Sequence, residues 1–218
     1  NEIAEIANNH NVHIHCDAVQ AVGKIEIDFK FSGLDSLAIS SHKIGGPSGV
    51  GALVVTNPLK LNPIIRGGGQ ERGFRSGTEN LPGIVGFGAA ARKTLSEVKA
   101  FRNMLKKQRQ FEKKIKNNLP EIIIMGENVE RLPNTTCVYM PHLSSEAQVI
   151  ALDLEGFAVS AGSACSSGKV KESHVLKAMG LDWASKNSIR ISSGWQNSEN
   201  DLEKLAQAYI ELYKRSYK

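Results

Sequence analysis

The sequence predicts an α/β domain followed by a smaller α+β domain within one chain of 218 residues. Short apolar runs that each end at a polar residue, separated by glycine-rich turns and helical pieces, predict the first domain. Apolar residues at helical spacing after residue 81 mark the change to the second domain. We place the first domain at residues 1–95 and the second at residues 96–218, hinged by a helix over residues 81–117.

The first domain is expected to contain one helix and three strands. Residues 2–9 read as a helix. Apolar residues alternate with histidines in the next run, which predicts a strand that ends at Asp17. Further strands are expected at residues 36–40 and 51–55. Because these runs are short, apolar and separated by turns and helical pieces, we expect a mostly parallel sheet that is largely buried.

The second domain begins with the long helix, which Pro120 ends. Apolar side chains recur along it at helical spacing from Leu95 to Ile115, so one face is expected to be buried. A last helix begins at Ser198, where Ser198 and Asp201 resemble an N-terminal capping pair. Between them, strands are predicted at residues 121–125, 135–139 and 188–192 and near Ala158, and helices at residues 146–154 and 175–179.

The composition is that of an ordinary globular protein, with 41% hydrophobic and 22% charged residues. No run approaches the roughly 20 apolar residues of a membrane-spanning helix, and we expect no membrane partner. Much of the net charge of +5 comes from residues 99–116, where eight Lys and Arg accompany one acid, Glu112. Such a run is typical of a solvated helix face, and we expect no direct contact with nucleic acid.

Three cysteines, Cys16, Cys137 and Cys165, are widely spaced and odd in number. They form neither a zinc-binding pattern nor a disulfide framework, so we expect no metal and a reducing compartment such as the cytoplasm. The first residue is Asn1 and not Met, so a targeting segment for an organelle matrix is also compatible with the sequence.

A lysine with unusual neighbours follows the second predicted strand. Residues 40–43 read Ser-Ser-His-Lys and lead into a glycine turn. Because ligands of open α/β sheets bind at the carboxyl ends of strands, Asp17 and Lys43 are expected to share one crevice. A lysine for the aldehyde and an acid for the pyridine nitrogen are what pyridoxal 5'-phosphate (PLP) requires. On spacing alone, Asp17 as a helix cap and Lys43 as an exposed lysine remain an equal alternative.

Three stretches in order along the chain resemble cysteine desulfurases of the NifS/IscS type. They are residues 15–20 (His-Cys-Asp-Ala-Val-Gln), residues 40–43, and residues 66–78 (Arg-Gly-Gly-Gly-Gln-Glu-Arg-Gly-Phe-Arg-Ser-Gly-Thr). The resemblance covers nearly the whole chain, and the third stretch is its most specific part. It implies the class V aminotransferase family of PLP-dependent transferases, fold type I, with a partial large domain followed by the small domain.

The resemblance also implies roles for the residues around the cofactor. Lys43 would be the Schiff-base lysine, and Asp17 would pair with the pyridinium nitrogen. Gln20 would contact the ring hydroxyl, while Ser40 and His42 would hold the phosphate.

A further cofactor contact is implied by the glycine-rich third stretch. Thr78 would reach the phosphate of the other subunit's cofactor, which implies a homodimer with shared sites. Glycines there suit a backbone that passes close to a ligand or partner, although they suit a surface loop equally well.

Small residues surround Cys165, which indicates an accessible thiol. Cys16 and Cys137 lie in strand-like runs and are expected to be buried apolar residues. Arg190 stands in an apolar strand, where a guanidinium needs an anionic partner. In the family Cys165 would accept the sulfur and Arg190 would bind the substrate carboxylate; an ion pair within the fold is the alternative for Arg190. His174 is read as structural.

The reaction implied by the resemblance is removal of sulfur from L-cysteine, which gives alanine and a persulfide on Cys165. The acceptors that the family indicates are iron–sulfur scaffolds and tRNA thiolation proteins. Relative to the family, the N-terminal part of the large domain is missing, so we expect this chain alone to be inactive. Selenocysteine lyase, another class V PLP enzyme and a non-catalytic half-enzyme that docks a partner remain alternatives.

Overall fold

The computed structural model describes residues 2–57, 61–162 and 172–216, and the chain divides into two compact units. The first unit comprises residues 1–99 and the second residues 100–218. One long helix, α2 (Leu81–Asn118), contributes residues to both units and ends just before Pro120. The sequence places the domain boundary after residue 95, within this same helix.

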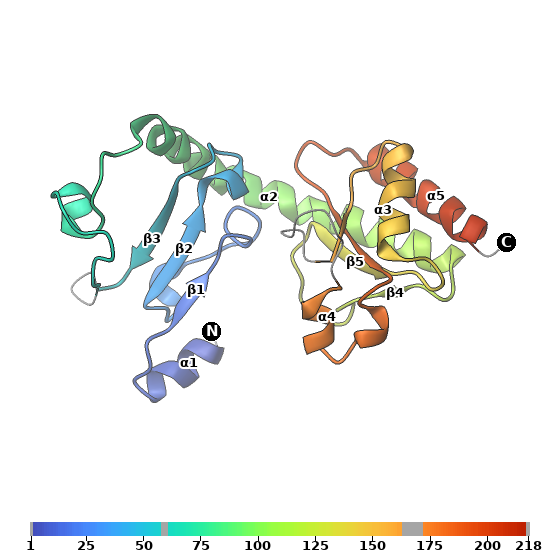
Figure 1. The fold of residues 1–218 in the computed structure, drawn as a ribbon, viewed down its shortest axis with the longest axis horizontal. Coiled ribbons are helices and arrows are strands. Elements are labelled where there is room, and N and C mark those ends of the chain that lie inside the picture. Colours follow the sequence, from blue (N-terminus) through green and yellow to red (C-terminus); the bar gives the residue numbers. More distant parts are fainter. Residues whose placement is uncertain (1, 58–60, 163–171, 217–218) are drawn as a thin grey trace. The chain divides into compact units, whose positions relative to one another are not determined.

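The first unit contains a helix and a three-stranded sheet (Figure 1). The strands run in the order β1-β2-β3, and β1 and β2 are parallel while β2 and β3 are antiparallel. The sheet is thus mixed and not mostly parallel as predicted. The connection between β2 and β3 is shorter than the dozen or so residues that a parallel crossover requires. The elements are α1 (Glu2–Asn9), β1 (His15–Asp17), β2 (Ser36–Ser40) and β3 (Gly51–Val55).

The first part of α2 packs closely on the segment that follows β2. A Cβ atom on Gly86 would lie 2.5 Å from Cγ of Pro47, and one on Gly46 would lie 3.1 Å from Cβ of Ala90. These distances are too short for larger side chains, so the small residues let the helix approach the backbone. The contact holds the segment that carries Lys43 in place.

Few apolar side chains of the first unit are fully buried. Within its described residues the buried hydrophobic side chains are Ala4, Ala18 and Leu37. Large apolar side chains are exposed on α1, on β3, in the segment after β3 and at the start of α2; they include Ile3, Ile6, Leu53, Ile64, Leu81 and Val85. The first unit therefore has only a small core of its own.

The second unit contains a four-stranded antiparallel sheet in the order β4-β5-β7-β6. β5 and β7 pair over their whole lengths, with Cys137 opposite Arg190 and Val138 opposite Ile189. The strands are β4 (Ile123–Ile124), β5 (Thr135–Tyr139), β6 (Ser160–Ala161) and β7 (Ser188–Ser192), and the helices are α3 (Ser145–Leu154), α4 (His174–Ala178) and α5 (Glu199–Ser216).

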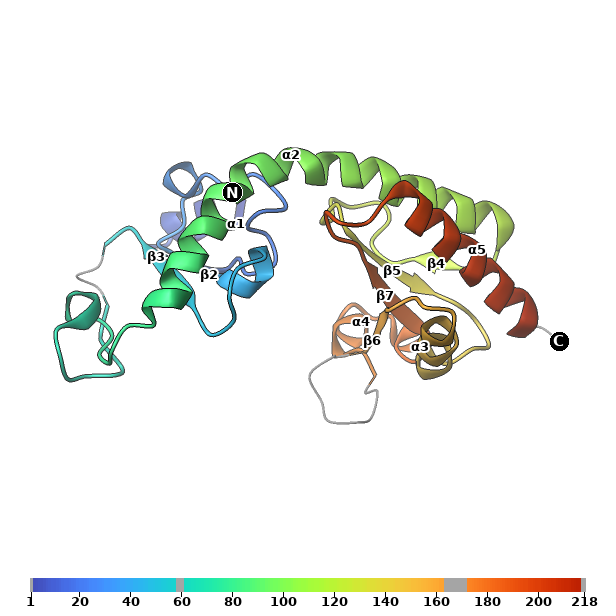
Figure 2. The same ribbon diagram turned by 90° about the horizontal axis from the view of Figure 1, so that it is seen from above.

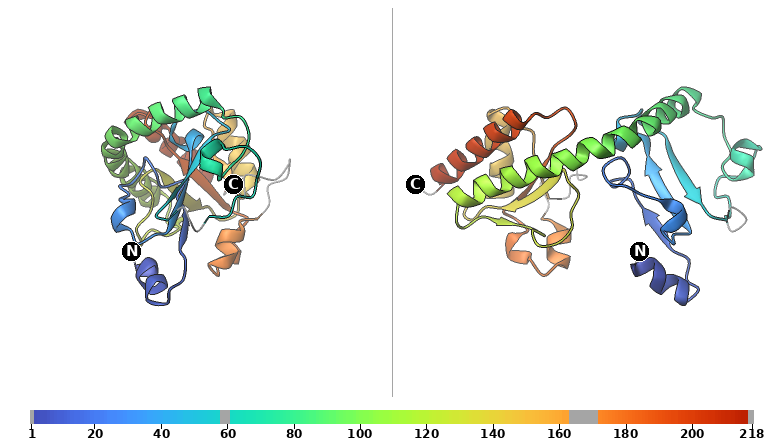
Figure 3. Two further views of the ribbon diagram at one scale, coloured as in Figure 1. Left: turned by 90° about the vertical axis from the view of Figure 1, so that its left-hand side faces the viewer. Right: turned by 180° about the vertical axis from the view of Figure 1, so that it is seen from behind.

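Alternation along the strands gives this sheet two different faces. Val138 and Ile189 point into a large core that α2, α3 and α5 complete. Cys137 and Tyr139 point to the opposite face, where they contact a smaller cluster that includes Leu176 of α4. Figures 2 and 3 show α5 lying beside the second half of α2.

No helix in the described part of the chain is both long enough and apolar enough to cross a membrane.

Candidate active site

The carboxyl ends of β1 and β2 form the first part of the site. Because the two strands are parallel, their carboxyl ends lie at the same edge of the sheet, and Asp17 stands opposite Ala38. β2 continues for two residues and ends at Ser40. The side chains of Asp17 and Ser40 therefore belong to one edge, as expected for a ligand site in an α/β sheet. Asp17 is exposed there.

The Asp17 carboxylate also has a structural role. Its Oδ1 accepts a hydrogen bond from the amide of Val19, 3.1 Å away, which closes the turn after β1. The alternative of a helix cap is therefore replaced by a cap on a turn, which uses one oxygen of Asp17. The side chain remains exposed and its second oxygen can accept a proton or a hydrogen bond.

The segment after β2 presents three polar groups to solvent. A short 3-10 helix, η2 (Ser41–Ile44), follows Ser40 and ends at Gly45 with a φ of 82°. The Ser40 hydroxyl and His42 Nδ1 are hydrogen-bonded at 2.9 Å. His42 and Lys43 are exposed. A hydroxyl, an imidazole and an amine on one turn can hold a phosphate and an aldehyde together.

Beneath this turn lies the fully buried hydroxyl of Ser41. Its Oγ has no hydrogen-bond partner within the described residues. A Cβ on Gly46 would lie 2.3 Å from this oxygen, so only glycine leaves it room. A buried hydroxyl without a partner is costly, and it commonly marks a functional segment.

Gln20 belongs to the turn after β1 and is exposed. Its Oε1 accepts a hydrogen bond of 2.8 Å from Nζ of Lys24. Burial lowers the pKa of Lys24, and the nearby charge of Lys43 lowers it further. The structure therefore brings a second lysine close to Lys43, which the sequence motifs did not indicate. The spacing of Gln20 and Lys24 by one helical turn is the signal that could have found it.

Thr78 lies in the exposed segment before α2. Two hydrogen bonds lie within the preceding residues. Ser76 Oγ donates to the carbonyl of Gly68, and the Gly77 amide donates to Oε1 of Gln70. Glu71 and Arg72 have positive φ angles of 47° and 58°, which are rare for residues other than glycine. In the described chain no hydrogen bond joins Thr78 to Ser40 or His42, so its role in the cofactor site stays a prediction.

The residues at this sheet edge match the chemistry of PLP. At the ends of two parallel strands and in the turns after them, a carboxylate, an amide, an imidazole and an amine are exposed, and the Ser40 hydroxyl is half-buried. The buried Ser41 hydroxyl, which has no partner within the described residues, and the close approach of Gly46 show that this turn is tightly packed. No group of three or more possible metal ligands occurs among residues 2–57, 61–162 and 172–216.

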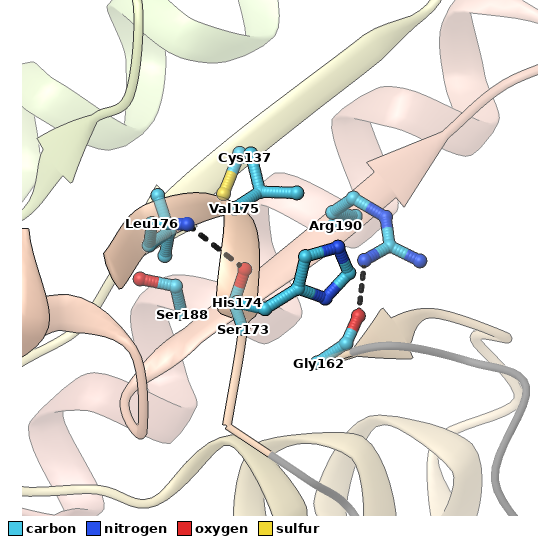
Figure 4. A pocket seen from close by; sticks show the side chains of 8 residues that line it. All are labelled: Cys137, Gly162, Ser173, His174, Val175, Leu176, Ser188 and Arg190. Carbon is cyan, nitrogen blue, oxygen red and sulfur yellow. Dashed lines mark hydrogen bonds between the residues drawn. The ribbon is translucent and has the colours of Figure 1, made fainter. Parts of the chain in front are cut away.

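The second unit contains a cavity of about 160 Å³ beside β7 (Figure 4). Arg190 and His174 are its charged and titratable lining groups, and Cys137 and Ser173 add a thiol and a hydroxyl. In Figure 4 the His174 ring and the Arg190 guanidinium face the same space. The cavity is suited to a small anion.

Arg190 is half-buried, between the buried residues Ile189 and Ile191. Its Nη1 donates a hydrogen bond of 2.5 Å to the carbonyl oxygen of Gly162. Within the described residues Arg190 forms no ion pair with a carboxylate. The alternative that Arg190 serves an ion pair within the fold therefore has no support in this part of the chain. The remaining guanidinium donors are available to a carboxylate ligand.

Cys137 differs from the sequence expectation. It is half-buried and lines the Arg190 cavity, as does His174, for which the sequence indicated no function. Burial raises the pKa of the Cys137 thiol, and the positive charges of Arg190 and Arg131 oppose that change. Cys16 is also half-buried, because each cysteine lies on a partly covered sheet face.

Cys165 lies outside the described residues. Among the described residues that flank it in the sequence, Gly162 and Ser173 both line the Arg190 cavity. Ser173 caps α4, with its Oγ accepting from the amide of Leu176 at 3.3 Å. The preceding Glu172 pairs with Lys177 and Lys186, and these cations lower the pKa of its carboxyl.

Comparison with known proteins gives consistent matches. The family model described as aminotransferase class-V matches residues 1–205. A cysteine desulfurase of Sinorhizobium fredii is 39% identical, over 98% of this chain and 56% of the relative. A NifS-like protein from Rickettsia africae has a structure 40% identical, with a TM-score of 0.88, covering 98% of this chain and 57% of that one.

A structure of SspA in complex with cysteine is also similar. It is 34% identical, with a TM-score of 0.65, and the match covers 88% of this chain and 53% of that chain. The chain therefore spans about half the length of the relatives that it matches.

Proposed function

The chain belongs to the class-V aminotransferase family, and from that premise we propose that it is the lysine-bearing and C-terminal part of a PLP-dependent cysteine desulfurase. The observation that carries the proposal is the parallel pairing of β1 and β2, which gathers the functional groups at one sheet edge. The relatives at about 39% identity are themselves cysteine desulfurases. The active protein would also contain polypeptide equivalent to the rest of those relatives.

Each residue at the sheet edge has a definite task in this proposal. Lys43 would hold the cofactor through its aldehyde, and its Nζ would be the base that removes the proton from the substrate Cα. Asp17 accepts the hydrogen bond of the pyridinium nitrogen, and Ser40 and His42 hold the phosphate. When bound, PLP supplies an electron sink for the electrons left at the substrate Cα.

The second unit supplies the groups that handle the substrate and its sulfur. Arg190 binds the carboxylate of L-cysteine with its planar pair of donors. The thiolate of Cys165 would attack the substrate sulfur and form a sulfur–sulfur bond while the sulfur–carbon bond breaks. The electron pair of the broken bond would pass to the substrate carbon, which would gain a proton and become the methyl group of alanine. The products are alanine and a persulfide on Cys165.

We also propose a homodimer and a sulfur acceptor for this protein. Thr78 would contact the cofactor of the partner subunit, and an iron–sulfur scaffold or a tRNA thiolation protein would take the persulfide sulfur. We also propose a reducing compartment such as the cytoplasm, because the three widely spaced cysteines of the sequence form no disulfide pattern.

The test is turnover of L-cysteine by the purified protein that contains these residues, supplied with PLP. Alanine and sulfide are measured for the wild type and for Cys165→Ala, Lys43→Ala and Arg190→Ala. We expect no turnover from Lys43→Ala and little from Cys165→Ala. For Arg190→Ala we expect a KM for cysteine at least about tenfold higher, since a charge-assisted bond is lost.

Cys16→Ala is the matched control, because it removes a half-buried thiol and should retain wild-type turnover. Borohydride reduction followed by peptide mapping identifies the lysine that holds PLP, and we expect Lys43. Equal alanine production by wild type and Cys165→Ala would contradict the proposed role of Cys165. PLP on another lysine would contradict the site at the edge of β1 and β2.

A further inference from the structure

The turn after β1 packs directly on the segment that carries Lys43. Gly23 is buried with a φ of 79°, and a Cβ there would lie 3.2 Å from Cγ2 of Ile44 and 3.2 Å from Cγ2 of Thr94. Ile44 follows Lys43 directly, and Thr94 belongs to α2. The glycine therefore lets the chain approach both, and it sets Lys24 beside the Lys43 segment.

Lys24 is half-buried in this position and is directed by one hydrogen bond. Its Nζ donates to Oε1 of Gln20 at 2.8 Å, and the turn between them is closed by the Lys24 amide, which donates to the carbonyl of Ala21 at 3.0 Å. The charge of Lys43 is close enough to affect the ionisation of Lys24. Within the described residues no carboxylate forms an ion pair with Lys24.

This hydrogen bond decides which end of the Gln20 amide is available. A primary amide carries an acceptor oxygen and a donor NH2 group, and the two ends exchange when the side chain turns over. An ammonium group can only donate, so it holds the oxygen end of Gln20. The NH2 end is then free to donate a hydrogen bond to an acceptor, such as the oxygen of the ring hydroxyl of PLP.

We infer that Lys24 is a positioning residue that fixes the orientation of the Gln20 amide, so that Gln20 acts as a donor to the cofactor. Lys24 itself touches neither cofactor nor substrate in this arrangement. The inference rests on the proposed PLP site and adds to it a residue that acts through Gln20.

The test measures PLP binding and the visible absorbance of bound PLP in the purified protein. It compares the wild type, Lys24→Met, Gln20→Ala and the double variant. We expect Lys24→Met to raise the Kd for PLP about three- to tenfold, the range of one oriented hydrogen bond, and to shift the absorbance maximum. In the Gln20→Ala background the same substitution should change the Kd by less than about twofold, because the group that it orients is gone.

Lys30→Met is the matched control, since Lys30 is an exposed lysine of the same unit, and wild-type binding is expected. Lys24→Arg keeps a donor and should bind PLP with an affinity between those of the wild type and Lys24→Met. If Lys24→Met does not fold, Lys24→Arg takes its place in the comparison. An affinity of Lys24→Arg for PLP as low as that of Gln20→Ala would then contradict the inference. If the fold increases in the Kd for PLP caused by Lys24→Met and by Gln20→Ala multiply in the double variant, Lys24 acts independently of Gln20 and the inference is wrong. Unchanged binding by Lys24→Met would overturn the inference while leaving the PLP site intact. No absorbance change in the wild type would overturn both.

Discussion

Glu112 of α2 carries a nearly buried carboxylate that several neighbours satisfy. Arg131 donates to both of its oxygens at 3.0 Å, and Thr136 donates to Oε1 at 2.7 Å. The Glu112 side chain is only 10% exposed. This acid therefore does not belong to the solvated face of α2, where it was expected among the basic residues.

Removing one partner of this pair should destabilise the second unit. We expect Arg131→Met to lower the free energy of unfolding by about 3 kcal/mol, because it leaves a buried carboxylate unpaired. Urea unfolding followed by tryptophan fluorescence measures this, since Trp183 and Trp195 both lie in the second unit.

Two further variants test the reason for that loss. The double variant Glu112→Met with Arg131→Met should recover most of the stability, because no charge remains buried. Lys116→Met removes a lysine of the same helix, α2, that forms an exposed pair with Glu127, and it should change stability by no more than about 0.5 kcal/mol. An equal loss in the exposed and the buried pair would contradict this explanation.

Cys137 reports on the charge of its cross-strand neighbour. Burial raises the pKa of its thiol, and Arg190 partly opposes this. Arg190→Met should therefore raise the pKa of Cys137 further, so that less thiolate exists at any pH below it. Alkylation of Cys137 followed by mass spectrometry across pH should show slower reaction and a rise at higher pH. Alkylation of Cys16, in the other unit, should not change.

At the scale of elements, α2 contains glycines with opposite surroundings. A Cβ on Gly86 would lie 2.5 Å and 2.8 Å from the ring of Pro47, whereas one on Gly88 would meet no atom within 4 Å. Gly88→Ala should stabilise the helix by about 0.5–1 kcal/mol through lower backbone entropy in the unfolded state.

Gly86→Ala gains the same entropy but should destabilise by about 1–2 kcal/mol net, because the proline ring must move. Hydrogen exchange of peptides that span residues 81–95 measures both variants. Exchange should slow in Gly88→Ala and accelerate in Gly86→Ala. Slower exchange in both variants would show that the Pro47 ring moves aside without a loss of stability, which would contradict the prediction.

The start of α5 has a reciprocal capping pair. The Ser198 amide donates to Oδ2 of Asp201 at 2.8 Å, and the Asp201 amide donates to Oγ of Ser198 at 3.2 Å. Ser198→Ala should lower stability by about 1 kcal/mol. The capping pair predicted from the sequence is thus present.

The hydrogen bonds from Ser198, backbone first, lower the pKa of Asp201 in the folded state. A lowered pKa gives stability that is fully present above the unfolded value, about 3.9, and is lost as the pH falls through the folded value. The stability difference between the wild type and Asp201→Asn should therefore be constant above about pH 5 and shrink below pH 3.9. Urea unfolding at several pH values measures it, and a difference that grows on acidification would contradict the argument.

At the scale of the whole molecule, the two units differ in how much apolar surface they bury. The second unit has a continuous core from α2 to α5, in which Ile115, Val138 and Tyr209 are fully buried. The described part of the first unit buries small residues and Leu37 and leaves large apolar side chains such as Ile3 and Ile64 exposed. Since buried apolar area supplies most of the folding free energy, the second unit should fold stably by itself and the first should not.

We expect residues 100–218, produced alone, to unfold cooperatively, with a single transition in urea by fluorescence and circular dichroism. Residues 1–99 alone should show no cooperative transition, because their core is too small to offset the loss of chain entropy. A cooperative transition in the 1–99 fragment would contradict this assignment.

Local sequence patterns predicted the elements well. The strand at residues 135–139 and the strand at 188–192 have the predicted bounds, and the long helix ends one residue after its predicted end. The predicted burial of side chains was less accurate, because burial depends on which other elements pack against a helix. The helical spacing predicts Leu95 on the buried face of the helix, but its side chain is 81% exposed. Periodicity shows which residues share a face, and it does not show whether another element covers that face at a given turn.

The sequence by itself determined the periodicities, the caps and the residue types of the candidate site, because each of these depends on neighbours within a few positions. Only the tertiary structure decided that β3 pairs antiparallel with β2, that Arg190 lines a cavity beside Gly162, and that the turn before Lys24 packs on the segment of Lys43. These features depend on strand pairing and packing between residues distant in the chain, which leave no periodic signal in the sequence.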